Sequence, residues 1–232
     1  SDVSILGTLL SPLAPRGLFL STALAELRVA MRDETDYRME AAHTEKMRLF
    51  LQSDPNFRVP HVAHELSSDR VIATEFLPGI PLDRCTVLSQ DTRNSIAKRM
   101  LSLTIRELFE FHTVQTDPNW SNFLYDEEAD VLNLIDFGAA QTYEHAFCYN
   151  YARLVKAAAD RNRQALLDVS LEMGFLTGQE KPEFLDAHVA AAFITGEPFA
   201  ADEYDFATCA MTERNSTHIG TMLAGRLKAP PR

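Results

Sequence analysis

The sequence is poor in the features that mark several large classes of protein. It has only three cysteines in 232 residues, Cys85, Cys148 and Cys209, which are far apart and lack the spacing of a metal site. Such cysteines are typical of reduced, buried thiols in a non-oxidising compartment. No run of Lys and Arg occurs, and the net charge is −11. Because binding of nucleic acid by its phosphates needs a basic patch, we expect no nucleic-acid partner.

Long apolar runs are also missing. No stretch reaches the roughly eighteen apolar residues that a membrane-spanning helix needs. The apolar opening, SILGTLLSPLAPRGLFL, is interrupted by Pro12, Pro15, Arg16 and Gly17, which makes it too broken for a signal sequence. We expect this segment to pack on the protein itself or to touch a membrane surface.

What the sequence does have is a pattern of mixed helices and strands. Hydrophobic residues make up 46% of the chain, enough for one large or two small domains. Helices are predicted from about Ser21 to Leu51 and over 89–111, and a buried strand at VIATEF (71–76). The segments NFLYD and VLNLIDF predict a hairpin around 127–130, and the chain from 146 onward is predicted to be helical. The expected fold class is α+β.

Two acids and an amide carry the strongest functional signal. Asp117 and Asn122 have the D-x-x-x-x-N spacing of a phosphoryl-transfer loop, and Asp136 opens a D-F-G at the end of a strand. Mg²⁺ prefers oxygen ligands, so Asn122 and Asp136 suit a metal site, while Asp117 can orient or deprotonate an attacking group. The alternative is that Asp117 and Asn122 cap turns and Asp136 ends a strand. The order and context of all three favour the metal site.

Other residues point to the same kind of site. Asp36 and Glu40 are four apart on one predicted helical face, and Glu34 falls on the apolar side. Like charges at this spacing destabilise a helix unless a cation faces them, although a solvated acidic face explains Asp36 equally well. Main-chain groups of Glu75, Phe76 and Leu77 are candidates to bind an adenine ring, against the alternative of a plain core strand. Trp120 is expected to anchor its loop by packing.

The residues after D-F-G lack a feature of protein kinases. A helical pattern resumes within about eight residues of Gly138, and no A-P-E motif follows, whereas a protein kinase needs a long activation segment to dock a peptide. This difference argues against ordinary protein substrates.

Four segments together resemble the UbiB family of atypical kinase-like proteins, most closely its mitochondrial, coenzyme-Q-biosynthesis branch. They are FEFHTVQTDPNWSNFLYD, LIDFGAA, KAAADRNRQAL and EMGFLTGQE. The resemblance implies a protein-kinase-like fold that binds ATP and Mg²⁺. It implies an ATPase or a kinase of small molecules or lipids that supports ubiquinone biosynthesis on the matrix side of the inner mitochondrial membrane. Quinone precursors and coenzyme Q biosynthetic proteins are the implied partners.

The resemblance also assigns roles by position. Asp117 matches the catalytic-loop aspartate, Asn122 the metal-binding asparagine and Asp136 the DFG aspartate. Glu34 and Asp36 match the E-x-D pair of the family, and Glu40 matches the helix glutamate that pairs with the nucleotide-binding lysine.

Upstream parts of the family pattern are not in this sequence. The K-x-G-Q helix, an alanine-rich nucleotide loop and the strand with the lysine would all precede Ser1, which is not a methionine. We therefore expect a fragment of a longer protein or a shortened gene product, with residues 1–80 forming an incomplete N-lobe and 81–232 a mostly helical C-lobe.

Two other classes of protein remain as alternatives. A degenerate kinase fold that binds a protein or lipid partner is favoured by the missing lysine. A small-molecule phosphotransferase of the aminoglycoside or choline type shares the Asp/Asn/Asp logic, but the DPNWSN loop and the E-x-D pair speak against it.

Overall fold

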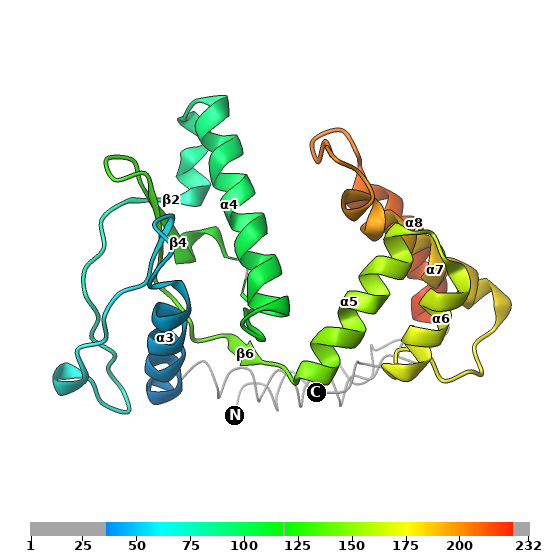
Figure 1. Ribbon diagram of the computed structural model, residues 1–232, viewed down its shortest axis with the longest axis horizontal. Coiled ribbons are helices and arrows are strands. Elements are labelled where there is room, and N and C mark those ends of the chain that lie inside the picture. The colour runs from blue at the N-terminus through cyan, green and yellow to red at the C-terminus, as the bar shows by residue number, and fades with distance from the viewer. Residues whose placement is uncertain (1–35, 118, 225–232) are drawn as a thin grey trace, which may run out of the picture. The chain divides into compact units, whose positions relative to one another are not determined.

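The computed structural model describes residues 36–224 apart from 118 (Figure 1). In chain order, the elements are α3 (Tyr37–Leu51), β1 (Phe57–Arg58), the 3₁₀ helices η1 (His64–Leu66) and η2 (Leu82–Val87) on either side of β2 (Ile80–Pro81), α4 (Gln90–Phe109), β3 (Thr113–Gln115), η3 (Trp120–Asn122), β4 (Phe123–Asp126), β5 (Val131–Leu134), β6 (Ala140–Thr142), α5 (His145–Ala159), α6 (Arg163–Glu172), α7 (Pro182–Gly196), η4 (Glu197–Phe199) and α8 (Met211–Ala224).

These elements form two compact units. One comprises the described residues up to 143, and the other runs from 144 to 224. The predicted lobe boundary near residue 80 falls inside the first unit, because β2 pairs with β4 and so belongs to the same sheet as the later hairpin. That boundary stays a prediction.

Helix α3 ends where the sequence predicts, at Leu51, but Asp36 is not part of it. The Asp36 backbone is non-helical, and its side chain accepts a hydrogen bond from the N–H of Met39 (3.2 Å). The first N–H groups of a helix have no partner within the helix, and a short acidic side chain just before the first turn can accept a hydrogen bond from one of them. Aspartate therefore favours this position. The prediction that Asp36 and Glu40 share one helical face is therefore wrong. The earlier part of the predicted helix, with Glu34, lies outside the described residues.

The predicted hairpin is confirmed and forms the centre of a four-stranded sheet in the order β1-β5-β4-β2. β4 and β5 are antiparallel, with Phe123 opposite Leu134, and β1 lies parallel to β5 on its other side. All four residues of β5 are buried, whereas β4 alternates between buried and half-buried residues. The strand that leads to Asp136 is thus the most enclosed one.

The prediction of a buried strand at VIATEF is wrong. The segment makes only isolated bridges, Val62 with Thr74 and Ser68 with Val71, and the side chains of Val71 and Phe76 are 52% and 87% exposed. Its residues bond on one edge to residues 61–63, and no other strand of the described residues pairs with it. The side chains of a strand are buried only where other elements pack against the faces of the strand. Few elements pack against VIATEF, so its side chains stay exposed.

Helix α4 confirms the predicted helix over 89–111 to within two residues. Ser89 caps it by accepting a hydrogen bond from the N–H of Thr92, and Ile96 and Leu103 lie in the core beside Met47, Leu132 and Phe137. At its far end, the Arg106 guanidinium donates to the carboxylate of Asp54 (2.6 Å), in the loop after α3. The core and this ion pair join α3, α4 and the sheet into one unit.

The second unit is helical, as predicted. Ala157, Leu166 and Val189 form its core, from α5, α6 and α7 respectively. A Cβ on Gly196 would lie 2.6 Å from the main-chain carbon of Ala158, so α5 and α7 approach each other closely there. No helix in the range 36–224 is long and apolar enough to cross a membrane.

Gly79 provides a test of the sheet packing. Its φ is 140°, and an added Cβ would lie 2.9 Å from the main-chain carbon and oxygen of Tyr125. Gly79→Ala should lower the free energy of unfolding by about 2 kcal/mol, measured by urea unfolding, because both the conformation and the contact are unfavourable.

Gly220→Ala is the matched control. Gly220 lies in α8 with no atom within 4 Å of an added Cβ. Alanine there should be neutral or raise stability by up to about 1 kcal/mol. Equal effects of the two substitutions would contradict the described packing around Gly79.

Candidate active site

The loop after β3 holds Asp117 and Asn122 together. Asn119 caps the short helix η3 by accepting a hydrogen bond from the N–H of Ser121 (3.1 Å), and this turn directs Asn122 inward, where it is buried. The side-chain NH₂ of Asn122 donates to Oδ2 of Asp117 (3.1 Å), whose own side chain is exposed. The five-residue spacing therefore brings a carboxylate and an amide into direct contact.

Asp136 follows the strand that pairs with the Asn122 end of β4, two residues after β5 ends. The N–H of Ile135 donates to the main-chain oxygen of Asn122 (3.1 Å), which extends the pairing of β4 and β5 by one step. Asp136 is the next residue, and its Oδ1 accepts a hydrogen bond from the N–H of Gly138 (2.9 Å). Asp136 therefore directly follows the residue that pairs with Asn122, whose side chain bonds to Asp117.

The donor set fits a magnesium ion. Because the NH₂ end of the Asn122 amide faces Asp117, its carbonyl oxygen is the end left to bind a cation. Likewise, the N–H of Gly138 donates to one carboxylate oxygen of Asp136, and the other oxygen is left to bind a cation. An amide oxygen and a carboxylate oxygen, completed by waters and phosphates, are ligands that Mg²⁺ accepts.

Helix α3 presents Glu40 to the D-F-G segment. A Cβ built on Gly138 would lie 3.5 Å from Oδ1 of Asp136 and 3.6 Å from Oε2 of Glu40, so both carboxylates flank Gly138. Burial and, after it, the negative charge of Asp136 raise the pKa of Glu40. In the described part of the chain, no lysine or arginine forms an ion pair with Glu40. A cation between the two carboxylates would relieve their repulsion.

The same face of α3 also holds the D-F-G phenylalanine. Phe137 is 1% exposed. Burial lowers the pKa of His43, one turn after Glu40, against the opposing effect of the main chain of Phe137. A neutral imidazole therefore packs where the helix meets the D-F-G segment.

The remaining acids of the predicted set are not brought to this point. Asp36 caps α3 and is exposed, and Glu34 lies outside the described residues. The roles assigned to them by resemblance stay predictions.

The segment proposed to bind adenine is tied to the sheet. Glu75 and Phe76 are exposed and Leu77 is buried. Glu75 exchanges bonds with His61, since its N–H donates to the His61 oxygen (2.8 Å) and its carboxylate accepts from the His61 N–H (3.3 Å). One residue beyond, the oxygen of Pro78 accepts a hydrogen bond from the side chain of Asn133 in β5 (2.6 Å). The adenine role of 75–77 stays a prediction.

Trp120 does not anchor its loop as predicted. Its side chain is 56% exposed, whereas Asn122 is 8% exposed. In a 3₁₀ turn, residues two apart lie on different sides, so the turn that buries Asn122 turns Trp120 outward.

Sequence reasoning missed Gln115, which connects the two halves of the site. Its side chain donates to the main-chain oxygen of Asp136 (2.7 Å) and accepts from the N–H of Asp117 (3.2 Å). Its place two residues before Asp117 was the available signal.

Sequence reasoning also missed Glu107. It lies 4% exposed in α4 and continues the stripe formed by Ile96, Met100 and Leu103. Burial raises its pKa to about 7, against the opposing effect of the main-chain N–H of Gln115. An acid in line with an apolar stripe was the signal for a buried carboxyl.

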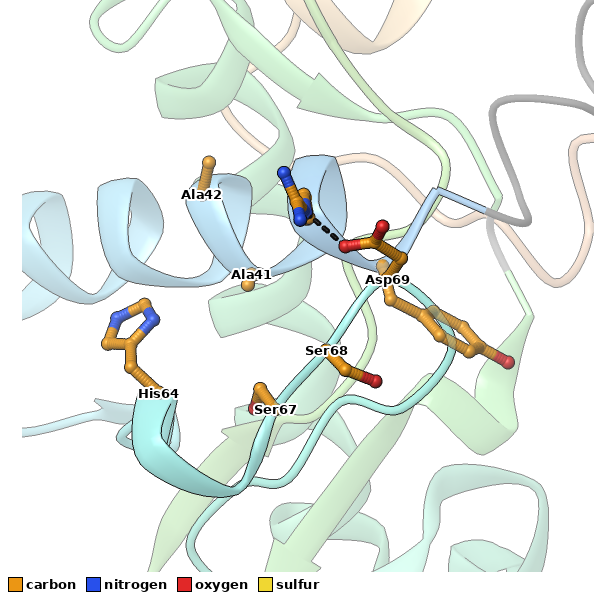
Figure 2. A pocket seen from close by; sticks show the side chains of 8 residues that line it. Ala41, Ala42, His64, Ser67, Ser68 and Asp69 are labelled. Carbon is orange, nitrogen blue, oxygen red and sulfur yellow. Dashed lines mark ion pairs between the residues drawn. The ribbon is translucent and has the colours of Figure 1, made fainter.

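A separate pocket of about 260 Å³ lies between α3 and the loop around η1 (Figure 2). It is lined by Tyr37, Arg38, Ala41, Ala42, His64, Ser67, Ser68 and Asp69. Arg38 and Asp69 form an ion pair across it. None of the predicted site residues lines it.

A loop aspartate bonded to an asparagine, a D-F-G aspartate just after strand β5 and a helix glutamate beside it match the arrangement expected of a protein-kinase-like site. The chain belongs to the family of the ABC1 atypical kinase-like domain, which matches residues 1–170. The resemblance and the α+β, kinase-like fold predicted from the sequence are both confirmed.

Two curated relatives are similar over nearly the whole chain. "Atypical kinase COQ8B, mitochondrial" from Rattus norvegicus is 47% identical over 218 residues, which cover 94% of this chain and 41% of the relative. "Atypical kinase COQ8, mitochondrial" from Saccharomyces cerevisiae is 37% identical over 236 residues, which cover 100% of this chain and 47% of the relative. The chain thus spans less than half the length of these relatives.

A solved structure supports the fold. The Rv3197–erythromycin complex from Mycobacterium tuberculosis aligns with a TM-score of 0.65 at 19% identity, covering 97% of this chain and 63% of that one.

Glu107 yields a pH prediction. Its pKa is raised from 4.5 to about 7 in the folded chain, so between these values the unfolded chain loses a proton that the folded chain keeps. Its contribution to stability is therefore complete below pH 4.5 and is lost as the pH rises through 7, by about 3 kcal/mol. Glu107→Gln should remove this loss.

Urea unfolding at about pH 5 and about pH 8 measures the effect as a difference between wild type and variant, in which other titrating groups cancel. Glu128→Gln, an exposed change of the same charge, is the control. If wild type and Glu107→Gln lose equal stability between the two pH values, the carboxyl is not held neutral.

Proposed function

We propose that this chain is the metal-binding part of an atypical kinase or ATPase that acts on Mg-nucleotide. The contact between Asn122 and Asp117, placed beside Asp136 by the register of β4 and β5, is the observation that carries the proposal. A purely structural loop has no need of an amide oxygen and a carboxylate aimed at one point.

Each residue has a distinct role in this proposal. Asn122 and Asp136 bind Mg²⁺, which bridges the phosphates and offsets their charge. Asp117 orients the attacking hydroxyl or water and accepts its proton, for which its exposed position is suited. Glu40 faces the cation-binding point from α3, where a lysine of the whole protein would pair with it. Main-chain groups of Glu75–Leu77 bind the adenine ring.

The substrate is proposed to be a small molecule or lipid rather than a protein. Helix α5 begins at His145, seven residues after Gly138, which confirms the short connection predicted from the sequence. So short a segment has no room for a peptide-docking loop. The relatives are named mitochondrial atypical kinases.

With the resemblance to the coenzyme Q branch, these names support a role in ubiquinone biosynthesis. The proposed location is the matrix side of the inner mitochondrial membrane, with peripheral membrane contact. Quinone precursors and coenzyme Q biosynthetic proteins are the proposed partners. In the whole protein, residues 1–80 would belong to an N-lobe and 81–232 to a C-lobe.

A non-catalytic binding module is the second candidate. The observation that favours it is Glu40, which forms no ion pair with a lysine or arginine among the described residues, whereas the matching glutamate of an active kinase pairs with a lysine. Such a module would bind a protein or lipid partner without turnover.

Calorimetry of Mg-ATP binding separates the two candidates. Asp136→Asn should weaken binding by about tenfold or more, because it removes a charged ligand of the metal. Asp91→Asn, an exposed carboxylate in the first turn of α4, makes the same charge change away from the site and should leave binding unchanged.

A longer version of the chain with the upstream residues completes the experiment. Binding by the longer version alone would show that the upstream residues are needed to hold the nucleotide. Absence of Mg-ATP binding in both versions would refute the enzyme and favour the binding module.

A further inference from the structure

Strand β5 carries an asparagine that the proposed metal site does not use. Asn133 is 0% exposed and lies between Leu132 and Leu134, which are also buried. An amide that leaves water is unfavourable unless it is hydrogen-bonded. Asparagine is also uncommon in strands, where a valine or leucine would suit so enclosed a position better. The amide at this position therefore requires an explanation other than packing.

Asn133 lies on the face of the sheet that points away from the core. Its neighbours Leu132 and Leu134 belong to the core, and successive side chains of a strand point to opposite faces. Asn133 is opposite Leu124 of β4, so these two side chains share a face. A Cβ on Gly79 would lie 3.1 Å from Cβ of Leu124. The segment around Gly79 therefore runs over the face that holds Asn133.

The Asn133 amide ties this segment to the strand. Its Nδ2 donates a hydrogen bond to the main-chain oxygen of Pro78 (2.6 Å). On one side of Pro78, the N–H of Glu75 donates to a main-chain oxygen before η1 (2.8 Å), and on the other side Ile80 pairs with β4. Over 76–79, between these two attachments, the bond from Asn133 is the one hydrogen bond present in the described part of the chain. Asn133 thus holds the middle of the segment.

The donor of the Asn133 amide is satisfied, but its acceptor is not. Oδ1 of Asn133 is buried and has no hydrogen-bond partner among the described residues. A buried acceptor without a partner is costly, whereas an apolar side chain of the same shape would avoid that cost. The bond to Pro78 is therefore the reason that we assign to an amide at this position.

The same strand leads to the proposed metal ligand. Asp136 follows Asn133 by three residues, and between them the N–H of Ile135 donates to the main-chain oxygen of Asn122 (3.1 Å). β5 thus carries a side chain bonded to the segment proposed to bind the base, and it is followed directly by the residues of the proposed metal site. One buried strand connects the two halves of the proposed nucleotide site.

We propose that Asn133 is a positioning residue, which fixes 76–79 on β5 and so holds the main chain of Glu75–Leu77 in place to bind the base of the nucleotide. This inference rests on the proposed function for the use of Glu75–Leu77. Its structural part, the hold of Asn133 on 76–79, is independent of nucleotide binding and is tested separately.

The experiment compares Asn133→Leu with wild type in the full 232-residue chain. Leucine has the same branched shape as asparagine but cannot donate a hydrogen bond to Pro78. Ile96→Ala is the control, since it truncates a core residue of α4 and leaves the Asn133 amide intact. Urea unfolding measures the stability of each variant.

Two readouts separate the structural part from the functional part. The ¹⁵N heteronuclear NOE of the main-chain N–H groups of Leu77 and Gly79 reports fast motion of the segment without any ligand. Calorimetry gives the affinities for Mg-ATP and for Mg-tripolyphosphate, which lacks the base. A residue that positions the base-binding segment affects the first ligand and spares the second, whereas a residue with a general structural role affects both.

Asn133→Leu should lower the NOE of Leu77 and Gly79, because the segment loses its central hydrogen bond. It should weaken Mg-ATP binding by about tenfold and leave Mg-tripolyphosphate binding within about twofold of wild type. The midpoint of urea unfolding should not fall, since the substitution also removes an unsatisfied acceptor. Ile96→Ala should lower that midpoint without changing the NOE or either affinity.

The proposal is overturned if Asn133→Leu leaves the NOE of Leu77 and Gly79 unchanged, if it weakens the binding of both ligands equally, or if Ile96→Ala has the same effects. Should Asn133→Leu not fold, Asn133→Thr replaces it, because the threonine hydroxyl is too short to reach the Pro78 oxygen, and an unchanged NOE in that variant overturns the proposal. If wild type does not bind Mg-ATP, the proposed function fails, while the NOE still decides whether Asn133 holds the segment.

Discussion

The candidate site depends on hydrogen bonds that tie the loop after β3 to the segment after β5. The N–H of Ile135 bonds to the oxygen of Asn122, and the side chain of Gln115 bonds to the oxygen of Asp136. The first bond joins residues 13 apart in the chain and the second joins residues 21 apart, and both involve main-chain groups that need a partner when buried. The buried face of the hairpin specifies the register of β4 and β5. A shift of one residue in this register would move the Asn122 amide away from the Asp136 carboxylate.

Two carboxylates of the candidate site lie close together. Glu40 and Asp136 flank Gly138, and their proximity contributes to the raised pKa of Glu40. Carboxylates are brought together in folded proteins when a cation or a shared proton offsets the repulsion. In the proposed function, Mg²⁺ takes that role.

The sequence predicted the parts of this structure that depend on local pattern. The hairpin and α4 follow from apolar periodicity, and the structure confirms both. The motif spacing singled out Asp117, Asn122 and Asp136, of which Asp117 and Asn122 are in direct contact, and their roles stay predictions. VIATEF was misassigned because burial depends on neighbouring strands, which no local pattern reveals. Gln115 and Glu107 were missed because their roles come from contacts across elements, although an acid on an apolar stripe gave a hint.

The central claim is that Asn122 and Asp136 bind one metal ion together with ATP. Mn²⁺ replaces Mg²⁺ at oxygen sites and broadens the NMR signals of nearby protons. With ATP and Mn²⁺, the account predicts selective loss of the Asn122 side-chain amide and the Gly138 main-chain amide signals, with the Gly220 amide retained. Retention of the Asn122 and Gly138 signals at a Mn²⁺ concentration that broadens others would contradict it.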